Sequence, residues 1–490
     1  MPIRKPIQTI TKQSLIYGIG NFANKFVAIL LIPIITRYLS LKEVGFVAII
    51  EMVDVLLVSI LMLGMANALL RFLPDKTRGQ QSEIISSIFW GRLFVDMMIA
   101  GGFIWISNTL VSWIGFPAQY HYLAPLIVIN AFFTVQGRFL LTLWRFHQHP
   151  QRFIVLSLTQ FVGVLMLSIY FIVIREHGVE GIVYARMIVF GISTLATIGF
   201  VLNKYTVFPS VSIFKIAQRF GYPLIPLAFV VPFLTTSDRF FLNQFVSLEQ
   251  IGIYSIGYKF GMLINILLVT PMQLAWVPMM YKMGLEEDSK KYYRDFIFYY
   301  TLVVSGIWVF ITLFREEFIQ VFATPEYLAG AKFIPFIGAA YLINGYRHFF
   351  IAGSALKDKT LRLGLASVVG IICNICLNYM LIKHWGVWGA AVSTILSYMI
   401  LVLLIYFVSH RQEPINWGGK PILGVISWSL IFLLLAEQGI QYLPFDTFVL
   451  NIILMFVFVF SLKLLGFLGP REINGVRSLF TMAWDKIFSK

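Results

Sequence analysis

Roughly fourteen apolar runs, each about 20 residues long or longer, follow one another along this chain with short polar breaks between them. A run of this length crosses the hydrocarbon core of a bilayer as one helix. The runs lie near residues 13–38, 44–71, 83–114, 120–144, 153–174, 180–202, 217–242, 250–281, 293–314, 330–355, 360–382, 387–408, 421–440 and 447–468. Charged residues make up only 12% of the chain, about half their share in a soluble domain. The sequence therefore predicts an all-α polytopic membrane protein with about 14 transmembrane helices and no separate soluble domain.

The basic residues are distributed unevenly among the polar breaks. With the N-terminus inside, the cytoplasmic segments hold roughly 24 Lys and Arg and the outer segments about 6, which is the positive-inside bias. An even number of spans also places the C-terminus inside. We therefore interpret the net charge of +15 as a topology signal and expect no nucleic-acid partner.

Two short stretches recur about two hundred residues apart along the chain. The stretch YLSLKEVGF returns as FVSLEQIGI, which matches Gly45 with Gly252 at an offset of 207 residues. The stretch HGVEGIVYA returns as WGVWGAAVS, which matches Gly178 with Gly386 at an offset of 208 residues. Two independent matches at nearly one offset indicate that the chain is an internal duplication.

The duplication divides the chain into parts. We expect a first repeat over residues 1–205 and a second over residues 206–410, each with six spans, and two extra spans over residues 411–470. Because six is even, both repeats have the same orientation and are related by a pseudo-two-fold axis along the membrane normal. Residues 471–490 have apolar side chains at a spacing of four, which predicts an amphipathic helix on the inner leaflet.

Six charged residues lie well inside the predicted spans, where an ionisable group costs about 2.5–3.5 kcal/mol on insertion scales. They are Lys25, Glu51, Asp54, Asp238, Arg239 and Lys259. All six fall on the first two spans of a repeat, the helices that would line a cavity between two lobes. Lys25 lies too deep to reach water by extending its side chain, and Lys259 lies well inside the eighth span, so we interpret both as functional.

Two roles stay open for each of the remaining pairs. Glu51 and Asp54 lie three residues apart on one face of the second span, where they could couple transport to protons or serve as counter-ions for Lys25. Asp238 and Arg239 could form a structural ion pair or take part in substrate binding.

A cavity that contained Lys25, Lys259 and Arg239 would be cationic. Such a cavity favours an anion, and clustered Lys and Arg most often bind phosphate or diphosphate. The chain has no HExxH, Walker-type or GxSxG motif, so we expect neither an enzyme nor a cofactor. Cys373 and Cys376 lie in an apolar helix without further ligands nearby, and we interpret them as packing residues and not as a metal site.

Other charges in the spans have simpler interpretations. Arg92 and Asp96 are spaced i and i+4 in the third span and are expected to pair with each other. Arg138, Arg186 and Arg347 lie nearer the span ends, where extension of the side chain to the interface is as reasonable as a functional role.

Three segments resemble a known family. GNFANKFVAILLIPIITRYLSLKEVGF at residues 20–46 resembles the opening of bacterial polysaccharide flippases of the O-antigen type, in the multidrug/oligosaccharidyl-lipid/polysaccharide exporter superfamily. FGYPLIPLAFVVPFLTTSDRFFLNQFVSLEQIGIYSIGYKFG at residues 220–261 resembles the start of the second lobe of that family, and NYMLIKHWGVWGAAVSTILSY at residues 378–398 resembles its close. The resemblance extends over essentially the whole chain, through helix-boundary patterns.

The resemblance implies two six-helix lobes that alternate between inward-open and outward-open forms in the cytoplasmic (inner) membrane, with both termini in the cytoplasm. It implies that undecaprenyl-diphosphate-linked oligosaccharide moves from the inner to the outer leaflet for O-antigen, capsule or exopolysaccharide assembly. Lys25 and Lys259 match the positions of basic residues that engage the diphosphate in related flippases. Lipid II flippases commonly carry Arg there, so a point charge replaces a bidentate fork.

Further expectations follow from the resemblance and its rivals. The implied partners are the polyprenyl-diphosphate-linked glycan and membrane lipids, with a polysaccharide polymerase and a chain-length regulator as candidate protein partners. A lipid II flippase, which also has two extra helices, and a multidrug cation/proton antiporter of the same superfamily are the alternatives. A non-transporting scaffold of a polysaccharide assembly complex is a more remote one, because a scaffold has no need of lysines deep in its spans.

Overall fold

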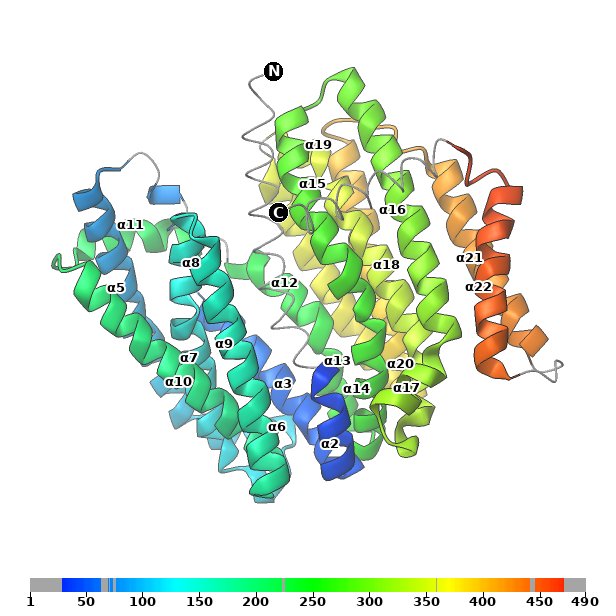
Figure 1. The fold of residues 1–490 in the computed structure, drawn as a ribbon. Coiled ribbons are helices and arrows are strands. Elements are labelled where there is room, and N and C mark those ends of the chain that lie inside the picture. Colours follow the sequence, from blue (N-terminus) through cyan, green and yellow to red (C-terminus); the bar gives the residue numbers. More distant parts are fainter. Residues whose placement is uncertain are drawn as a thin grey trace. The chain divides into compact units, whose positions relative to one another are not determined.

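A computed structural model gives the fold and describes residues 29–62, 69, 71–73, 76–222, 225–357, 359–440 and 446–470 (Figure 1). The described residues form helices joined by short connections, and they contain no β-strand. Eleven helices in this part of the chain are long and apolar enough to cross a membrane. The all-α polytopic class is therefore confirmed. The predicted tail helix over residues 471–490 lies outside the described residues.

Three features explain why eleven such helices are found where about fourteen spans are predicted. Most of the first predicted span lies outside the described residues. The seventh is divided into two short helices, α12 (Ile225–Thr236) and α13 (Asp238–Phe245). The eleventh and twelfth run together as α20 (Thr360–His410), which departs from helical geometry only at Gly386. The count of fourteen itself stays a prediction.

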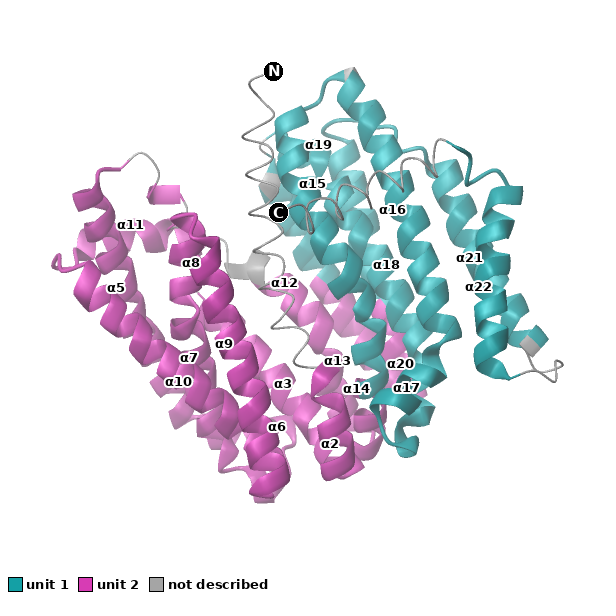
Figure 2. Cartoon of the chain, in the orientation of Figure 1, with its two compact units in different colours: residues 1–14, 256–370, 395–490 teal, residues 15–255, 371–394 magenta. Residues whose placement is uncertain are grey.

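The chain forms two compact units (Figure 2). We call residues 15–255 with 371–394 the N-terminal unit, and residues 256–370 with 1–14 and 395–490 the C-terminal unit. The division at residue 205 inferred from the duplication is a different partition of the chain and stays a prediction.

The N-terminal unit consists of helices. They are α2 (Ile32–Tyr38), α3 (Leu41–Leu61), α5 (Arg78–Trp105), α6 (Ser107–Ile114), η1 (Ala118–Tyr120), α7 (Leu123–Gly137), α8 (Phe139–Phe146), α9 (Pro150–Ile169), η2 (Tyr170–Ile174), α10 (Val179–Lys204), α11 (Val211–Gly221), α12, α13, the start of α14 (Leu248–Gly261) and the central part of α20. Capping boxes begin α3 and α5: Ser40 with Glu43, and Thr77 with Gln80, satisfy backbone N–H groups reciprocally.

The C-terminal unit continues from α14. Its other helices are η4 (Asn265–Val269), α15 (Thr270–Met283), α16 (Glu287–Leu313), α17 (Arg315–Phe322), η5 (Pro325–Phe333), α18 (Ile334–Phe350), α19 (Ala352–Ala355), the two ends of α20, α21 (Gly419–Ile440) and α22 (Thr447–Leu464). The hairpin α21–α22 packs on α16. Polar contacts fix it there: Asn451 Nδ2 donates to the Leu313 carbonyl oxygen at 2.9 Å, and Arg315 lies 2.6 Å from Glu437.

The glycines of the first repeated motif lie against each other within the N-terminal unit. A Cβ atom added to Gly45 would lie 1.9 Å from the Leu248 carbonyl oxygen, and one added to Gly252 would lie 2.5 Å from the Leu41 carbonyl oxygen. The two contacts are reciprocal, because Leu41 and Leu248 are themselves matched by the 207-residue offset. Helices α3 and α14 therefore meet backbone to backbone at the motif that the duplication copied.

The glycines of the second motif also keep a common conformation. Gly178 has φ 58° and ψ −133°, and Gly386 has φ 53° and ψ −129°. Positive φ values of this kind favour glycine because it has no Cβ atom. Each glycine comes directly before the helix that the copied sequence forms, so the two copies share a local structure as well as a sequence.

Candidate functional site

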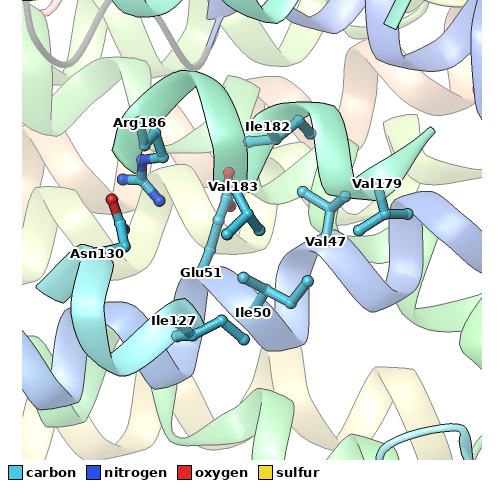
Figure 3. A pocket seen from close by; sticks show the side chains of 9 residues that line it. All are labelled: Val47, Ile50, Glu51, Ile127, Asn130, Val179, Ile182, Val183 and Arg186. Carbon is cyan, nitrogen blue, oxygen red and sulfur yellow. The ribbon is translucent and has the colours of Figure 1, made fainter. Parts of the chain in front are cut away.

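Three helices of the N-terminal unit, α3, α7 and α10, surround a small pocket (Figure 3). Each contributes one face, because its lining residues recur at helical spacing of three and four. Most of the lining side chains are apolar, and the polar ones are Glu51, Asn130 and Arg186. Helical periodicity thus brings one predicted site residue, Glu51, together with two residues from distant parts of the sequence.

Asp54 lies one turn beyond Glu51 on α3 and is almost completely buried, with 3% of its surface exposed. Its Oδ1 accepts a hydrogen bond from Asn130 Nδ2 at 2.8 Å, and its Oδ2 lies 3.3 Å from Arg186 NH1. Arg186 thus serves as a counter-ion of Asp54. Whether Lys25 also does so stays a prediction, because Lys25 lies outside the described residues.

A second arginine lies at the end of α7. Arg138 occupies the junction between α7 and α8, and its guanidinium group lies 5.7 Å from the centre of the Phe190 ring of α10. Sequence reasoning gave Arg138 and Arg186 no clear role. The signal that could have identified Arg186 is its position on the stripe Val179, Ile182 and Val183, which is the face of α10 that lines the pocket.

Asp238 and Arg239 form a buried ion pair at the start of α13. Arg239 NH1 lies 2.6 Å from Asp238 Oδ1 and also donates to the Thr235 carbonyl oxygen at 2.8 Å. Tyr254 of α14 donates to Asp238 Oδ2 at 3.0 Å. The two charged side chains are 3% and 7% exposed, so each neutralises the other in a place where a single charge would be costly.

A polar network lies next to this ion pair, in the N-terminal unit. Asn374 Oδ1 accepts hydrogen bonds from Ser237 Oγ at 2.7 Å and from Asn378 Nδ2 at 3.1 Å. Ser393 Oγ donates to Asn378 Oδ1. All four side chains are buried, and the network joins the junction of α12 and α13 to the central part of α20.

Lys259 belongs to the C-terminal unit and is 8% exposed. The preceding residue, Tyr258, exchanges a hydrogen bond of 3.0 Å with Tyr341 of α18. Two turns further along α18, Arg347 NH2 lies 3.5 Å from Nε2 of the buried His348. The depth of Lys259 in the membrane and a role for it in substrate binding both stay predictions.

Other sequence hypotheses have mixed outcomes. Arg92 and Asp96 pair as predicted, with Arg92 Nε 3.0 Å from Asp96 Oδ2, and Gln136 Nε2 also donates to that oxygen at 2.6 Å. The interpretation of both cysteines as core-packing residues is wrong for Cys376, which is exposed on α20, while Cys373 is half-buried. In a membrane span an apolar position facing lipid has the same hydropathy as one facing the core, so sequence does not separate them.

These features define a polytopic helical membrane protein with charged groups inside its spans. The fold is similar to that of lipid II flippase MurJ in an inward closed conformation, with a TM-score of 0.71, 14% identity, and coverage of 92% of this chain and 99% of that one. It is also similar to inward-facing and outward-facing structures of multidrug resistance MATE family transporters of the MOP superfamily. Their TM-scores are 0.61 and 0.60, their identities 13% and 16%, and they cover 82% and 86% of this chain and 96% of each of theirs.

The chain belongs to the polysaccharide biosynthesis protein family, whose model matches residues 10–284. This confirms the family predicted from the sequence. A curated relative, the uncharacterized membrane protein MJ1068 of Methanocaldococcus jannaschii, is 26% identical over 199 residues, which are 40% of this chain and 37% of that protein. The chain thus matches little more than a third of the length of that relative.

Proposed function

We propose that this protein moves undecaprenyl-diphosphate-linked oligosaccharide from the inner to the outer leaflet of the cytoplasmic membrane by alternating access, for cell-surface polysaccharide assembly. Membership of the polysaccharide biosynthesis protein family is the observation that carries the proposal. The transporter fold supports it, as do the charged residues inside the spans. Both termini would lie in the cytoplasm, and a polymerase and a chain-length regulator would act on the delivered glycan.

In this proposal Lys25 and Lys259 hold the diphosphate group as point charges. Arg239 would be a third ligand, and in this structure its guanidinium group is paired with Asp238 at 2.6 Å. Glu51 and Asp54 would couple transport to protons or serve as counter-ions for Lys25. Asp238 would serve as the counter-ion of Arg239.

Two related functions remain as alternatives. The similarity to lipid II flippase MurJ favours lipid II as a second candidate substrate, because its carrier has the same diphosphate group. The similarity to MATE transporters favours a multidrug cation/proton antiporter. Burial of Lys259 in an apolar span argues against a cationic substrate, because like charges repel strongly at low dielectric.

The test is flipping in proteoliposomes, scored by the access of an external sugar-modifying enzyme to a polyprenyl-diphosphate oligosaccharide. Lys25→Gln and Lys259→Gln are each expected to slow flipping about tenfold or more, since a charge-assisted hydrogen bond contributes about 1.5–3 kcal/mol. Lys332→Gln, which changes an exposed lysine of η5, is the matched control and should flip at the wild-type rate.

Full activity in both lysine variants would contradict the diphosphate site. Lipid II, tested in the same vesicles, separates the first alternative. If the wild-type protein moves no lipid-linked glycan but accumulates an organic cation against a proton gradient, it is a multidrug antiporter instead.

A further inference from the structure

Helix α11 packs on α5 with one side, and its contacts fix which side faces the protein. The backbone N–H of Ser210, directly before α11, donates to Ser87 Oγ of α5 at 2.7 Å. One turn later Phe214 packs so closely on α5 that a Cβ atom added to Gly91 would lie 2.4 Å from its ring. Ala217 is buried in the apolar core that α11 shares with α5. The opposite face of α11 is therefore turned away from the unit.

This opposite face combines basic and apolar side chains. The exposed residues of α11 are Val211, Ser212, Lys215, Ile216 and Arg219, which helical periodicity places on one continuous face. Val211 and Ile216 lie at its two edges and are 68% and 55% exposed, and Lys215 and Arg219 lie between them. A basic stripe with apolar side chains along its edges is typical of a helix that lies in the interface of a membrane.

The chain that leads into α11 extends the same surface. Figure 1 shows α11 at the end of the N-terminal unit where α10 ends. The last residue of α10, Lys204, is exposed, and Phe208 in the connection is 92% exposed. Within the described part of the chain, no carboxylate forms an ion pair with Lys204, Lys215 or Arg219. The surface thus has three positive charges that these residues do not neutralise.

We propose that this surface, which consists of Lys204, Phe208 and the exposed face of α11, binds the head groups of anionic lipids. Its Lys and Arg side chains hold the lipid phosphate through charge-assisted hydrogen bonds. Phe208, Val211 and Ile216 enter the boundary between head groups and acyl chains. Charge complementarity selects an anionic lipid over a zwitterionic one, because each basic residue near an anionic leaflet adds to the attraction.

The position of the surface favours lipid over an acidic protein as the partner. Both helices that adjoin it, α5 and α10, are candidate membrane spans. A lysine at the end of a span, such as Lys204, typically lies among the lipid head groups. The apolar side chains of α11 are also divided by the basic stripe, so they form no continuous apolar centre of the kind that protein interfaces have. The inference goes beyond the proposed function and does not depend on the transported substrate.

The test is quenching of a fluorescent label by spin-labelled lipids. The label NBD is attached to Ser212→Cys in a background with Cys373→Ala and Cys376→Ala, and the full-length protein is reconstituted into phosphatidylcholine vesicles. Equal small fractions of spin-labelled phosphatidylglycerol or spin-labelled phosphatidylcholine are then included, and titration of each gives its relative affinity for the surface. Phosphatidylglycerol should quench more strongly than phosphatidylcholine, and concentrated salt should reduce the difference, because it screens exposed charges.

The variant Lys215→Gln with Arg219→Gln should lose this preference. Its relative affinity for phosphatidylglycerol is expected to fall about fivefold for each charge removed, the usual contribution of one basic residue at an anionic leaflet. Lys215→Arg with Arg219→Lys keeps both charges and should retain the preference, which separates loss of charge from a change in folding. Lys282→Gln with Lys291→Gln removes two exposed charges from α15 and α16; it is the matched control and should behave like wild type.

Equal quenching by the two lipids in the wild-type protein would overturn the inference. An unchanged preference for phosphatidylglycerol in the double glutamine variant would overturn it as well. Quenching by aqueous iodide but by neither lipid would show that the surface lies in water, where an acidic protein could bind it, and would also overturn the inference. All three results concern the lipid around α11, so the proposed function is tested separately by flipping.

Discussion

At the scale of single residues, Glu51 and Asp54 show how one turn of α3 changes the surroundings of a carboxyl group. Asp54 is buried and held by both Asn130 and Arg186. Glu51 is half-buried and borders the pocket. The sequence spacing places them on one face, but only the neighbours distinguish them.

A histidine outside the spans gives a prediction about stability and pH. Burial lowers the pKa of His147, and the nearby charges of Lys204 and His149 lower that pKa further. Folding therefore favours neutral His147, whose Nε2 lies 3.2 Å from the hydroxyl of Tyr205. The contribution of this preference to stability is fully present above the unfolded-state pKa of about 6.5. It is lost as the pH falls from that value through the lower pKa of the folded state.

We expect the melting temperature of the wild-type protein to fall between pH 7.5 and pH 5.5, and that of His147→Gln to fall less, because glutamine remains uncharged. Thermal unfolding in detergent, followed by tryptophan fluorescence, measures the difference. His384→Gln, which replaces an exposed histidine of α20, should follow the wild-type curve. Parallel curves for wild type and His147→Gln would show that His147 does not contribute to the pH dependence.

At the scale of helices, the contact between α3 and α14 depends on the absence of side chains. Gly45 and Gly252 allow each backbone to reach the carbonyl oxygen of a leucine on the other helix. Close approach of this kind is common between membrane helices, where van der Waals contact and weak Cα–H···O contacts replace the hydrophobic effect.

Gly45→Ala would place a methyl group 1.9 Å from the Leu248 carbonyl oxygen, so α3 and α14 must separate. We expect destabilisation of about 1–3 kcal/mol, the usual range for overpacking, visible as a lower melting temperature. Gly101→Ala in α5, where an added Cβ meets nothing within 4 Å, is the control and should be neutral or slightly stabilising, because alanine favours helix. Equal melting temperatures for the two variants would argue against a tight α3–α14 contact.

The duplication shows how far the sequence predicts this fold. Matched glycines imply matched backbone, because the conformations of Gly178 and Gly386 and the close contact of Gly45 with Gly252 depend on glycine itself. The candidate site was less accessible to sequence reasoning. Asp238 and Arg239 are adjacent in the sequence, so an ion pair between them could be predicted. The hydrogen bonds and ion pair of Asp54 join residues far apart in the sequence and could not.

The reason is physical. Helical periodicity determines which residues share a face of one helix, but it does not determine which face of a neighbouring helix lies opposite. Asn130 and Arg186 were therefore missed as partners of Asp54, although each lies on the pocket-lining face of its own helix. Hydropathy cannot help either, since a buried face and a lipid-facing one are equally apolar, as Cys376 shows.

At the scale of the whole molecule, the predicted six spans per repeat would make corresponding loops emerge on the same face of the membrane. Gln119 and Glu326, at an offset of 207, are exposed in η1 and η5. His149 and Lys357, at an offset of 208, are exposed in two other connections. If the repeats are parallel, each pair lies on one face, and the two pairs lie on opposite faces.

We expect cysteines introduced at Gln119 and Glu326 to react with a membrane-impermeant maleimide in intact cells, and cysteines at His149 and Lys357 to react only after permeabilisation. The variants need a background with Cys373→Ala and Cys376→Ala, because both native cysteines are free and Cys376 is exposed. Labelling of Gln119 and Glu326 from opposite faces would indicate inverted repeats.

The contact of the two motifs also contains a surface ion pair whose members are matched by the duplication. Lys42 Nζ lies 3.4 Å from Glu249 Oε1, and both positions correspond at the 207-residue offset. A symmetric homodimer of a single repeat would bring this position against its own copy, so that two lysines or two glutamates would face each other. Two separate positions of one chain can carry opposite charges, whereas one position of a symmetric homodimer cannot. At this pair of positions the two motifs are therefore no longer interchangeable.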